Sequence, residues 1–531
     1  MTYDFVIVGA GSAGCVLANR LSADPGIRVL LIEAGGPDRA MEVRIPAAFK
    51  KLFKTPLDWN YTTVPQAGLD GRALYWPRGR MLGGSSSMNA QMWARGHRAD
   101  YDGWAEAGND GWDYDSVVPF FHRAERRAGS NARGCYGTEG PLWIEELRDP
   151  NPLTGAFLAA CAESGLTRLA EMNGPDNTGF APTPVTQHRG RRWSAADGYL
   201  RPALGRSNLT VITGALVHRV LLDGDRATGV EYRDAAGTVT RAEATREVIL
   251  SAGAIGSPHL LQLSGIGDPD RLAAAGIDMR HELPLVGEGL QDHLAVVVAV
   301  RTPRPISLVS AESTGNLLRY LLFRKGMLTS NVGEAAAFIR SDPTLPAPDL
   351  ELIFAPVPFL DHGLTDPPGH GMSIGIVLLQ PESRGRITAT SADPAEAPLI
   401  DPGYLTDPGG HDLRRLVHGV EQAQHLYATA ALSPHVSGPI EPADPGADRE
   451  AFIRSQAETL YHPVGTCAMG AVVDATLRVH GLTGLRVVDA SVQLNIIRGH
   501  THAPTVMVAE RAAALIRDPA SYRPTHGAHD V

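Results

Sequence analysis

Short apolar runs that end at glycine or at an acid recur along the chain and predict buried strands. The clearest runs cover Phe5–Val8, Arg28–Ile32, Leu209–Thr213, Glu247–Leu250 and Leu485–Val488. Short apolar runs bounded by turn residues are typical of strands that are covered on both faces. Because these runs lie near both ends of the chain, they predict one sheet built from distant segments and a discontinuous first domain.

A different pattern begins at Leu294–Val300. The stretches Asp349–Ala355, Met372–Leu379 and Gly385–Thr390 are strand-like and are separated by Pro and Gly residues. This texture favours an antiparallel sheet over alternating strands and helices.

Apolar residues at helical spacing predict two helices in the second half of the chain. They cover Leu413–Ala428 and Pro504–Ile516, and the second has its proline in the first turn, where proline is tolerated. The residues after Arg517 are rich in Pro, His and Gly and predict a loose tail.

Composition narrows the class of protein. The chain has 531 residues and a net charge of −10, which argues against non-specific binding of nucleic acid. The four cysteines show no CxxC spacing, so neither a metal site nor a disulfide framework is predicted, and a reducing compartment is the simplest interpretation. Without a signal peptide before the first strand or a long apolar run, we expect no transmembrane segment and a cytoplasmic location.

The first predicted strand leads into a glycine-rich turn with three glycines, Gly9, Gly11 and Gly14, and Glu33 closes the next strand. Gly9 allows a tight turn, Gly11 lets the backbone approach a pyrophosphate, and Gly14 lets the helix pack close to the strand. The helix start offers free N–H groups to phosphates, and an acid at Glu33 suits ribose hydroxyls. The pattern predicts a dinucleotide site; the alternative is a glycine turn in an ordinary βαβ unit.

Further segments combine glycines, serines and histidines. The segment Arg78–Asn89 pairs glycines with serines, which suits close contact with a polar cofactor chain, although a surface linker would have a similar composition. The others are Tyr461–Gly470, Val488–Ser491 and Arg498–Thr505.

Together with Ser251–Pro258 and Val286–His293, these segments resemble the glucose–methanol–choline (GMC) oxidoreductase family, flavoproteins that oxidise alcohols. The resemblance runs from residue 3 to about residue 517 and has a choline dehydrogenase-like character. One departure is Gly289, at a position where Asn is common.

The resemblance implies an α/β fold (α+β overall) with two domains. A discontinuous Rossmann-like FAD-binding domain is expected from residues 1–150, 205–295 and 460–520, including a flavin loop at 75–100. A substrate-binding domain, with a mainly antiparallel sheet backed by helices, is expected from residues 151–204 and 296–459, followed by a tail at 521–531.

The resemblance also implies which residues contact FAD. The expected set is Gly9, Gly11, Ser12, Ala13, Gly14, Glu33, Ala34, Arg80, Gly83, Gly84, Ser85, Asn89, Ala90, Val217, Ala252, Asp489, Ala490, His502, Pro504 and Thr505. Some relatives attach flavin covalently through a His at the position of Met88, whose thioether cannot form that bond, so non-covalent FAD is expected. The helix that starts at Pro504 should direct free N–H groups of Thr505 and Val506 toward the negative charge of reduced flavin.

His462 and His500 match the catalytic pair of the family. A neutral imidazole can accept the alcohol proton, so we expect His462 to be the base and His500 to orient the alcoholate, although the roles could be exchanged. His502 is expected at the flavin pyrimidine edge. No metal site is predicted.

Candidate substrate contacts are less specific. Glu334 and Gln380 match family positions near the substrate, and Leu460 and Tyr461 precede the first histidine. A structural role for Glu334 is an equal alternative. An aromatic cage for a cationic alcohol would have to use Tyr461, Phe354 and Phe359.

The predicted activity is oxidation of an alcohol to an aldehyde or ketone, with electrons passed to a quinone-type acceptor or to O2. The expected partners are a small-molecule alcohol and that acceptor, in a monomer or small homo-oligomer. Alternatives on the same scaffold are a hydroxynitrile lyase-like enzyme, a light-driven decarboxylase and a non-catalytic flavin-binding protein.

Overall fold

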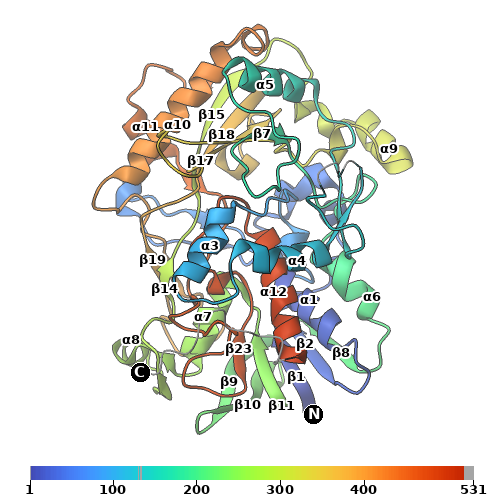
Figure 1. Cartoon of the computed structure of the whole chain (residues 1–531), viewed down its shortest axis with the longest axis vertical. Helices are drawn as coiled ribbons and strands as arrows, with labels where there is room; N and C mark the ends of the chain where they lie inside the picture. Colours follow the sequence, from blue (N-terminus) through green and yellow to red (C-terminus); the bar gives the residue numbers. More distant parts are fainter. Residues whose placement is uncertain (1, 130, 132–133, 519–531) are drawn as a thin grey trace.

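Two sheets, one above the other along the long axis of the molecule, organise the chain (Figure 1). The computed structural model describes residues 2–129, 131 and 134–518, so the tail expected at 521–531 lies outside the described residues. The lower sheet is largely parallel and the upper one is antiparallel, which confirms the predicted fold class. The residue bounds given for the two domains stay a prediction.

The lower sheet brings together strands from both ends of the sequence. Its order is β8 (Leu209–Thr213), β2 (Val29–Glu33), β1 (Thr2–Val8), β11 (Val239–Leu250), β10 (Arg226–Arg233) and β9 (Leu216–Asp223), with β23 (Leu485–Val487) also paired to β11. The strands β8, β2, β1, β11 and β23 pair in parallel, and β10 and β9 are antiparallel. The apolar runs at the two ends of the chain therefore meet in one core.

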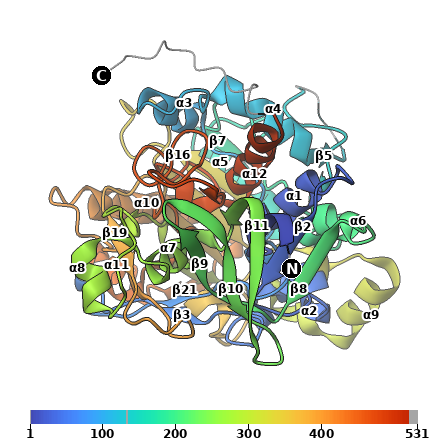
Figure 2. The ribbon, with the colours of Figure 1, turned by 90° about the horizontal axis from the view of Figure 1, so that it is seen from below.

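Helices cover the faces of this sheet. α1 (Ser12–Leu21) and α12 (His502–Arg517) pack against each other, and α4 (Tyr114–Ala124) lies against α12 (Figure 2). Arg20 on α1 and the fully buried Glu510 on α12 form a salt bridge with an N–O distance of 2.6 Å. α7 (Gly253–Leu263) follows β11 and packs against β9. The first and last helices of the chain are thus held side by side.

The upper sheet has the order β21 (Gly438–Glu441), β15 (Leu294–Arg301), β18 (Gly371–Leu378), β17 (Leu350–Ala355), β16 (Ala335–Ile339) and β7 (Gly179–Pro182), and β22 (Glu458–Thr459) pairs with β15. The prediction for Gly385–Thr390 was wrong about its partners. That run forms β19 (Gly385–Thr388) in a separate sheet between β14 (Glu288–Leu290) and β20 (Leu399–Asp401). Alternation in a strand indicates which face is buried but not which strand lies beside it.

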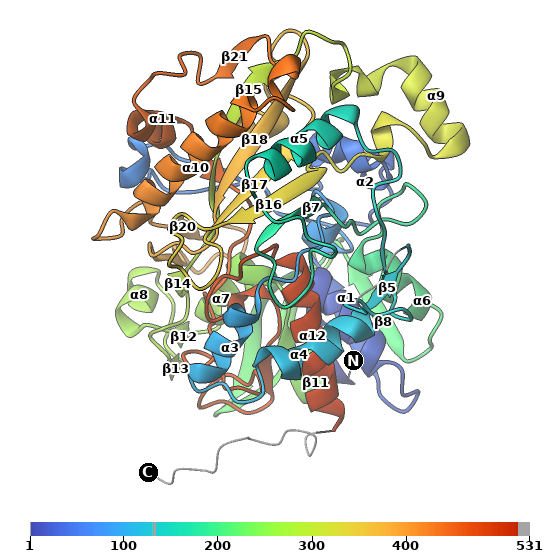
Figure 3. The ribbon, with the colours of Figure 1, turned by 45° about the horizontal axis from the view of Figure 1, so that its top comes forward.

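The two faces of the upper sheet differ in character. α10 (His411–Ala428), α5 (Pro152–Glu163) and α11 (Arg449–Gln456) lie over one face (Figure 3). On this face large apolar side chains such as Leu352, Phe354 and Ile376 form a core with Leu416 and Val420 of α10. The alternate residues of the same strands face the other way, toward the lower sheet.

The remaining elements are short. They are α2 (Met41–Arg44), α3 (Arg98–Glu106), α6 (Arg201–Ala203), α8 (Pro269–Ala274), α9 (Thr314–Phe323), β3 (Tyr61–Thr62), β4 (Tyr75–Trp76), β5 (Glu125–Arg127), β6 (Leu142–Ile144), β12 (Ile266–Gly267) and β13 (His281–Glu282). α9 lies at the edge of the molecule, away from the layers around both sheets (Figures 1 and 3). Within the described parts of the chain, no helix is both long enough and apolar enough to cross a bilayer.

Candidate active site

A cavity of about 820 Å³ lies between the two sheets and reaches from the turn after β1 to two histidines. Its lower end is lined by Gly9, Gly11 and Glu33, and its other end by His462 and His500. The free face of the upper sheet forms one wall. That wall consists of Ala295, Val297, Ile353, Ala355, Ser373, Gly375 and Val377.

The glycine turn at the lower end has the geometry that the sequence predicts. A β-carbon at Gly14 would lie 1.8 Å from the carbonyl oxygen of Gly9, so only glycine lets the helix pack this closely. Gly9 has φ +96°, and a β-carbon there would meet Ser251 O at 2.5 Å. Around Gly11, by contrast, the nearest atom to such a carbon is 4.0 Å away, and this residue lines the cavity. The backbone at Gly11 is therefore open to a ligand.

Glu33 lies at the end of β2, beside this turn. One carboxylate oxygen accepts a hydrogen bond from Ala10 N and the other from Gly35 N, each at 2.8 Å. Burial raises the pKa of Glu33, and the two backbone N–H groups act in the opposite direction. Since each oxygen can accept a further hydrogen bond, Glu33 could still bind a ribose hydroxyl from the cavity.

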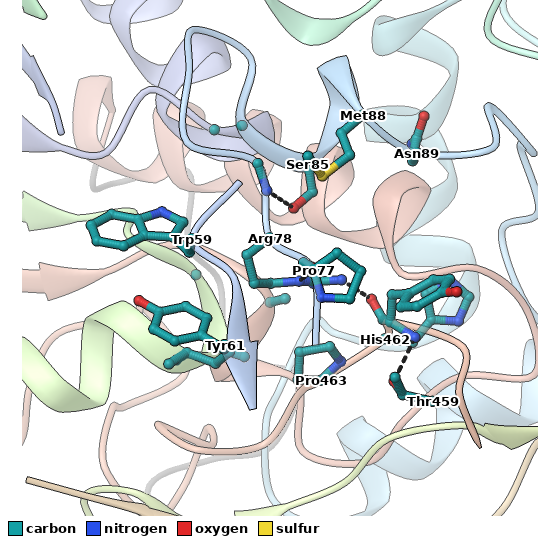
Figure 4. Close-up of a pocket in the computed structure, with 18 of the residues that line it drawn as sticks. Trp59, Tyr61, Pro77, Arg78, Ser85, Met88, Asn89, Thr459, His462 and Pro463 are labelled. Carbon is teal, nitrogen blue, oxygen red and sulfur yellow. Dashed lines mark hydrogen bonds between the residues drawn. The ribbon is translucent and has the colours of Figure 1, made fainter. Parts of the chain in front are cut away.

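The glycine–serine loop packs directly on the turn. Gly83 N donates to Ala10 O at 2.7 Å, and a β-carbon at Gly84 would lie 2.8 Å from Gly11 Cα. Ser85, Met88 and Asn89 line the cavity along this loop (Figure 4).

The loop after β23 is fixed by a buried acid. The carboxylate of Asp489 accepts hydrogen bonds from Gly253 N at 2.8 Å, Ser257 Oγ at 2.5 Å, Ser491 N at 2.8 Å and Ser491 Oγ at 2.6 Å. These bonds occupy both oxygens. Asp489 therefore joins its own loop to the start of α7, and Ala490 beside it also lines the cavity.

The start of the last helix differs from the prediction. α12 begins at His502, two residues before Pro504, and Thr505 N donates to Thr501 O at 3.1 Å. The expectation that Thr505 and Val506 present free N–H groups was therefore wrong, because those residues lie beyond the orphan positions of the first turn. The N–H groups of His502 and Ala503 hold those positions.

His502 joins the two ends of the sequence. Its Nδ1 lies 2.9 Å from Ser12 Oγ, and its ring packs edge-to-face on Trp93. Burial lowers the pKa of His502 to about 4, so the ring is neutral at pH 7. Its Nε2 is buried and has no hydrogen-bond partner within the described structure.

Three more cavity residues carry buried polar atoms without a partner in the described parts of the chain, namely Ser251 Oγ, Arg80 Nε and Gln91 Oε1. Buried polar groups are normally satisfied, so a set of such atoms around one cavity indicates a polar ligand. Together with the open backbone at Gly11 and the acid at Glu33, they fit a dinucleotide.

Most of the predicted cofactor residues line the cavity: Gly9, Gly11, Ser12, Ala13, Glu33, Ala34, Arg80, Gly84, Ser85, Asn89, Ala90, Val217, Ala252, Asp489, Ala490, His502 and Thr505. Gly14, Gly83 and Pro504 do not line it. Gly14 and Gly83 instead allow close packing within their own turn and loop, because a β-carbon would lie 1.8 Å from Gly9 O at Gly14 and 2.1 Å from Ser87 Oγ at Gly83.

His462 follows β22, and its backbone is held by a buried acid. Asp292 accepts hydrogen bonds from His462 N and Thr459 Oγ1, both at 2.6 Å, and from the hydroxyl of Tyr404. The residue before the histidine, Tyr461, has φ +67°, a left-handed conformation that is uncommon for a side chain of this size.

Arg78 stabilises this bend. One of its terminal nitrogens donates to Tyr461 O at 2.5 Å, and Figure 4 shows the side chain reaching the main chain beside His462. The main chain at His462 is therefore held from two other segments, by Asp292 and by Arg78.

A third histidine determines which nitrogen of His462 carries a proton. His293 Nε2 lies 3.2 Å from Leu379 O, a carbonyl that can only accept, so this nitrogen bears the hydrogen. Burial lowers the pKa of His293 to about 3, so the ring is neutral and its Nδ1 is an acceptor. His462 Nδ1, at 2.9 Å, must then donate to it. In neutral His462 the proton is on Nδ1, and Nε2 keeps its lone pair.

His500 is paired with a buried acid. Its ring centroid lies 4.9 Å from that of His462, and its Nε2 lies 3.0 Å and 3.2 Å from the two oxygens of Glu351. Glu351 is fully buried in β17, opposite Val377, on the cavity face of the sheet. A buried carboxylate needs a charged or strongly donating partner, which His500 supplies through Nε2.

The predicted substrate residues divide into two groups. Leu460 and Tyr461 line the cavity, whereas Glu334 and Gln380 do not. The carboxylate of Glu334 is fully buried and accepts bonds from Asn151 N at 2.7 Å and from the hydroxyls of Thr154 and Ser330, both at 2.6 Å. This arrangement corresponds to the structural alternative for Glu334.

Gln380 and one of the expected aromatic walls also lie away from the cavity. The side-chain amide of Gln380 donates to the backbone oxygens of Leu379 and Ile496 at 3.0 Å and 2.8 Å. Phe354 was wrongly expected as an aromatic wall: it stacks on Phe157 in the core on the helix side of the sheet. Phe359 does line the cavity.

Sequence reasoning missed Glu351, His293, Asp292 and Arg78 as site residues. Two signals were available. Glu351 is an acid inside an otherwise apolar strand run, and Asp292 and His293 stand together in the block Val286–His293 that carried the family resemblance.

Comparison with known proteins places these features in a family. Models described as GMC oxidoreductase match residues 3–295 and 381–509. An uncharacterised GMC-type oxidoreductase of Mycobacterium tuberculosis is 49% identical, covering 97% of this chain and 99% of its own. An alcohol dehydrogenase [acceptor] of Pseudomonas putida is 41% identical, covering 97% and 95%.

Among solved structures, formate oxidase of Aspergillus oryzae, studied for modification of its FAD, superposes with a TM-score of 0.91 at 27% identity and covers 98% of this chain and 99% of its own. The two relatives and formate oxidase are all oxidoreductases. The lyase and decarboxylase alternatives are therefore not favoured.

Proposed function

The chain belongs to the GMC oxidoreductase family, and from this premise we propose that it oxidises an alcohol to an aldehyde or ketone with FAD as its cofactor. The observation that carries the proposal is the contact between His462 Nδ1 and His293 Nδ1, which assigns the proton of neutral His462 to Nδ1 and leaves its Nε2 with a lone pair. That histidine lines the cavity and retains partial exposure there. A nitrogen base held in this way suits removal of a proton from a hydroxyl group.

FAD is the expected cofactor, and we propose that it is held without a covalent bond. The glycine turn, Glu33, the glycine–serine loop and the start of α12 would hold it, and Met88 offers no group that forms the bond known in some relatives. When bound, FAD supplies a ring system that accepts a hydride from the α-carbon of the alcohol.

In the proposed reaction His462 Nε2 accepts the proton of the alcohol hydroxyl. His500 orients the alcohol oxygen, and Glu351 fixes the His500 ring through Nε2. The proton that leaves the alcohol stays on His462 while the α-carbon loses its hydride.

We further propose that the alcohol has an apolar body. Met92, Ala295, Val377, Ile353 and Leu460 pack in one apolar cluster and also line the cavity. Leu460 is two residues from His462, so this apolar wall lies close to the proposed base. An apolar wall gives binding energy to carbon chains or rings and none to a charged group.

For the electrons we propose an acceptor other than O2, in line with the alcohol dehydrogenase [acceptor] to which the chain is similar. Anaerobic mixing with apolar primary alcohols, aryl alcohols, sugar alcohols and choline tests the substrate. Loss of flavin absorbance near about 450 nm with the apolar alcohols, and slow recovery in air, is the expected result. Bleaching by choline or sugar alcohols alone would contradict the apolar substrate, rapid recovery in air would identify an oxidase, and no bleaching by any alcohol would contradict the proposed function.

The mode of attachment has its own test. Acid precipitation of the yellow protein should release all of the flavin into the supernatant. Colour that stays with the precipitate would show a covalent bond and would overturn the non-covalent proposal.

A further inference from the structure

α9 exposes an unusual amount of apolar surface for a helix of a globular chain. Among the described residues, eleven large apolar side chains are clearly exposed, and five of them fall in the segment that ends with this helix. These five are Val309, Leu318, Leu321, Leu322 and Phe323, with exposed fractions of 46%, 54%, 48%, 70% and 64%. We call them the α9 patch. Exposed apolar side chains concentrated in one short segment are typical of a binding surface.

The helix that carries the patch is firmly attached. Tyr320 is fully buried and packs with Ile45, Ala48 and Leu328, and Leu317 joins the same cluster. Tyr320 also donates a hydrogen bond to Arg44 O at 3.2 Å. Since one face of α9 is fixed in this way, the outward direction of Leu318, Leu321 and Leu322 is a property of the fold.

Cations surround the patch. Arg319 and Lys325 are exposed on and just after α9, and Arg148 lies beside the helix end, because a β-carbon at Gly190 would approach both Arg324 O and Arg148 Cδ. Two acids lie close by, and both are engaged: Glu312 is paired with Lys51 at 2.9 Å, and Asp149 accepts a hydrogen bond from Gly326 N at 2.7 Å. This local excess of positive charge stands against a net charge of −10 for the whole chain.

We propose that the α9 patch docks the protein on an anionic lipid bilayer. Apolar side chains flanked by Lys and Arg are the pattern of helices that lie in the membrane interface, where the apolar face enters the acyl region and the cations meet lipid phosphates. A second copy of the chain is a poorer occupant. In a two-fold symmetric dimer the patch would face itself, and Arg319 and Lys325 would oppose the same cations of the partner.

The α9 patch lies close to a wall of the cavity. Val332 lines the cavity and packs in the same apolar cluster as Leu317 and Tyr320. The bilayer would therefore lie beside a wall of the cavity. Docking itself does not depend on the proposed alcohol oxidation.

The test uses the full-length holoprotein and sedimentation with two kinds of vesicle, one of phosphatidylcholine and one of phosphatidylcholine with phosphatidylglycerol. We expect binding to the anionic vesicles that weakens with added salt, and little binding to the neutral ones. Leu322→Asn combined with Phe323→Asn should lower the partition coefficient at least about tenfold. Arg319→Gln combined with Lys325→Gln should weaken binding to anionic vesicles about tenfold.

A matched control is Met279→Asn combined with Leu285→Asn, two side chains that are each 49% exposed outside the patch. This variant should bind like the wild type, and unchanged FAD content and melting temperature would show that each variant is folded. Failure of the wild type to bind anionic vesicles, or equal binding by the patch variant, would overturn the proposal. A wild-type dimer that becomes a monomer in the patch variant would assign the patch to a second copy and would also overturn it.

Discussion

The two ends of the cavity differ in whether backbone or side-chain groups define their geometry. At the lower end the glycine turn and Glu33 come from one short stretch of the chain, and the geometry of the turn depends on backbone contacts such as the close approach of Gly14 to Gly9. The upper end consists of side chains, His293, Glu351, His462 and His500, that come from four separate segments. The comparison teaches that binding and chemistry are separable here, because changes at one end should leave the other nearly intact.

The largest expected effect is at the upper end. His462→Ala removes the proposed base and should slow flavin reduction by an alcohol about 10²- to 10⁴-fold, while FAD content stays the same. Stopped-flow reduction under anaerobic conditions measures the rate. His418→Ala, on α10 and outside the cavity, is the control and should behave like the wild type. Near-normal reduction in His462→Ala would remove this residue from the mechanism.

Glu351 sharpens the same contrast with a smaller effect. Glu351→Leu removes the partner of His500 Nε2 and should slow reduction about 100-fold, whereas Glu351→Gln keeps an acceptor and should cost about tenfold. The partial rescue by glutamine separates positioning of His500 from a purely structural role. Equal rates in the two variants, or a rate that matches the wild type, would contradict the positioning role.

At the lower end the expected effect is on binding. Glu33→Gln keeps one acceptor for the backbone N–H groups of Ala10 and Gly35 and should weaken FAD binding about tenfold. At saturating FAD, the reduction rate should match that of the wild type. Titration of the apoprotein followed by fluorescence measures the affinity. Normal affinity for FAD together with slow reduction in this variant would contradict the division between a binding end and a catalytic end.

The smallest expected effect concerns the pH dependence of flavin reduction, which should be nearly flat around pH 6.5. Burial, followed by the neighbouring His500 and His293, lowers the pKa of His462 well below its ordinary value of 6.5. A lowered pKa keeps the base neutral at lower pH, so the reduction rate should stay nearly constant as the pH falls through 6.5. It should fall only when the pH approaches the lowered pKa. A profile with its midpoint near 6.5 would show that His462 titrates as an exposed imidazole.

The same contrast explains what the sequence could predict. Gly9, Gly11, Gly14 and Glu33 follow each other closely, so spacing alone predicts their arrangement, and Leu209–Thr213 forms a strand with the predicted bounds. The partner of a strand is decided by tertiary packing, which is why β19 was assigned to the wrong sheet.

The upper end was predicted only in part for a related reason. His462 and His500 belong to recognisable segments, but the contacts between His293 and His462 and between Glu351 and His500 span 169 and 149 residues. No local sequence pattern predicts a side-chain contact between residues so far apart in the chain. Glu334 shows the converse case, since a residue at a matching position proved to be bonded to its neighbours within the fold.

The two faces of the upper sheet are under different constraints: one face packs in the core, and the other lines the cavity. Residues on the helix side are held by the core, so large changes there should be eliminated by loss of stability. On the cavity side there is room for change, because a β-carbon at Gly375 would meet nothing closer than 3.9 Å. Homologues can therefore diverge in what they bind by exchanging the cavity-side residues of β15, β17 and β18 other than Glu351, while the residues between them preserve the architecture.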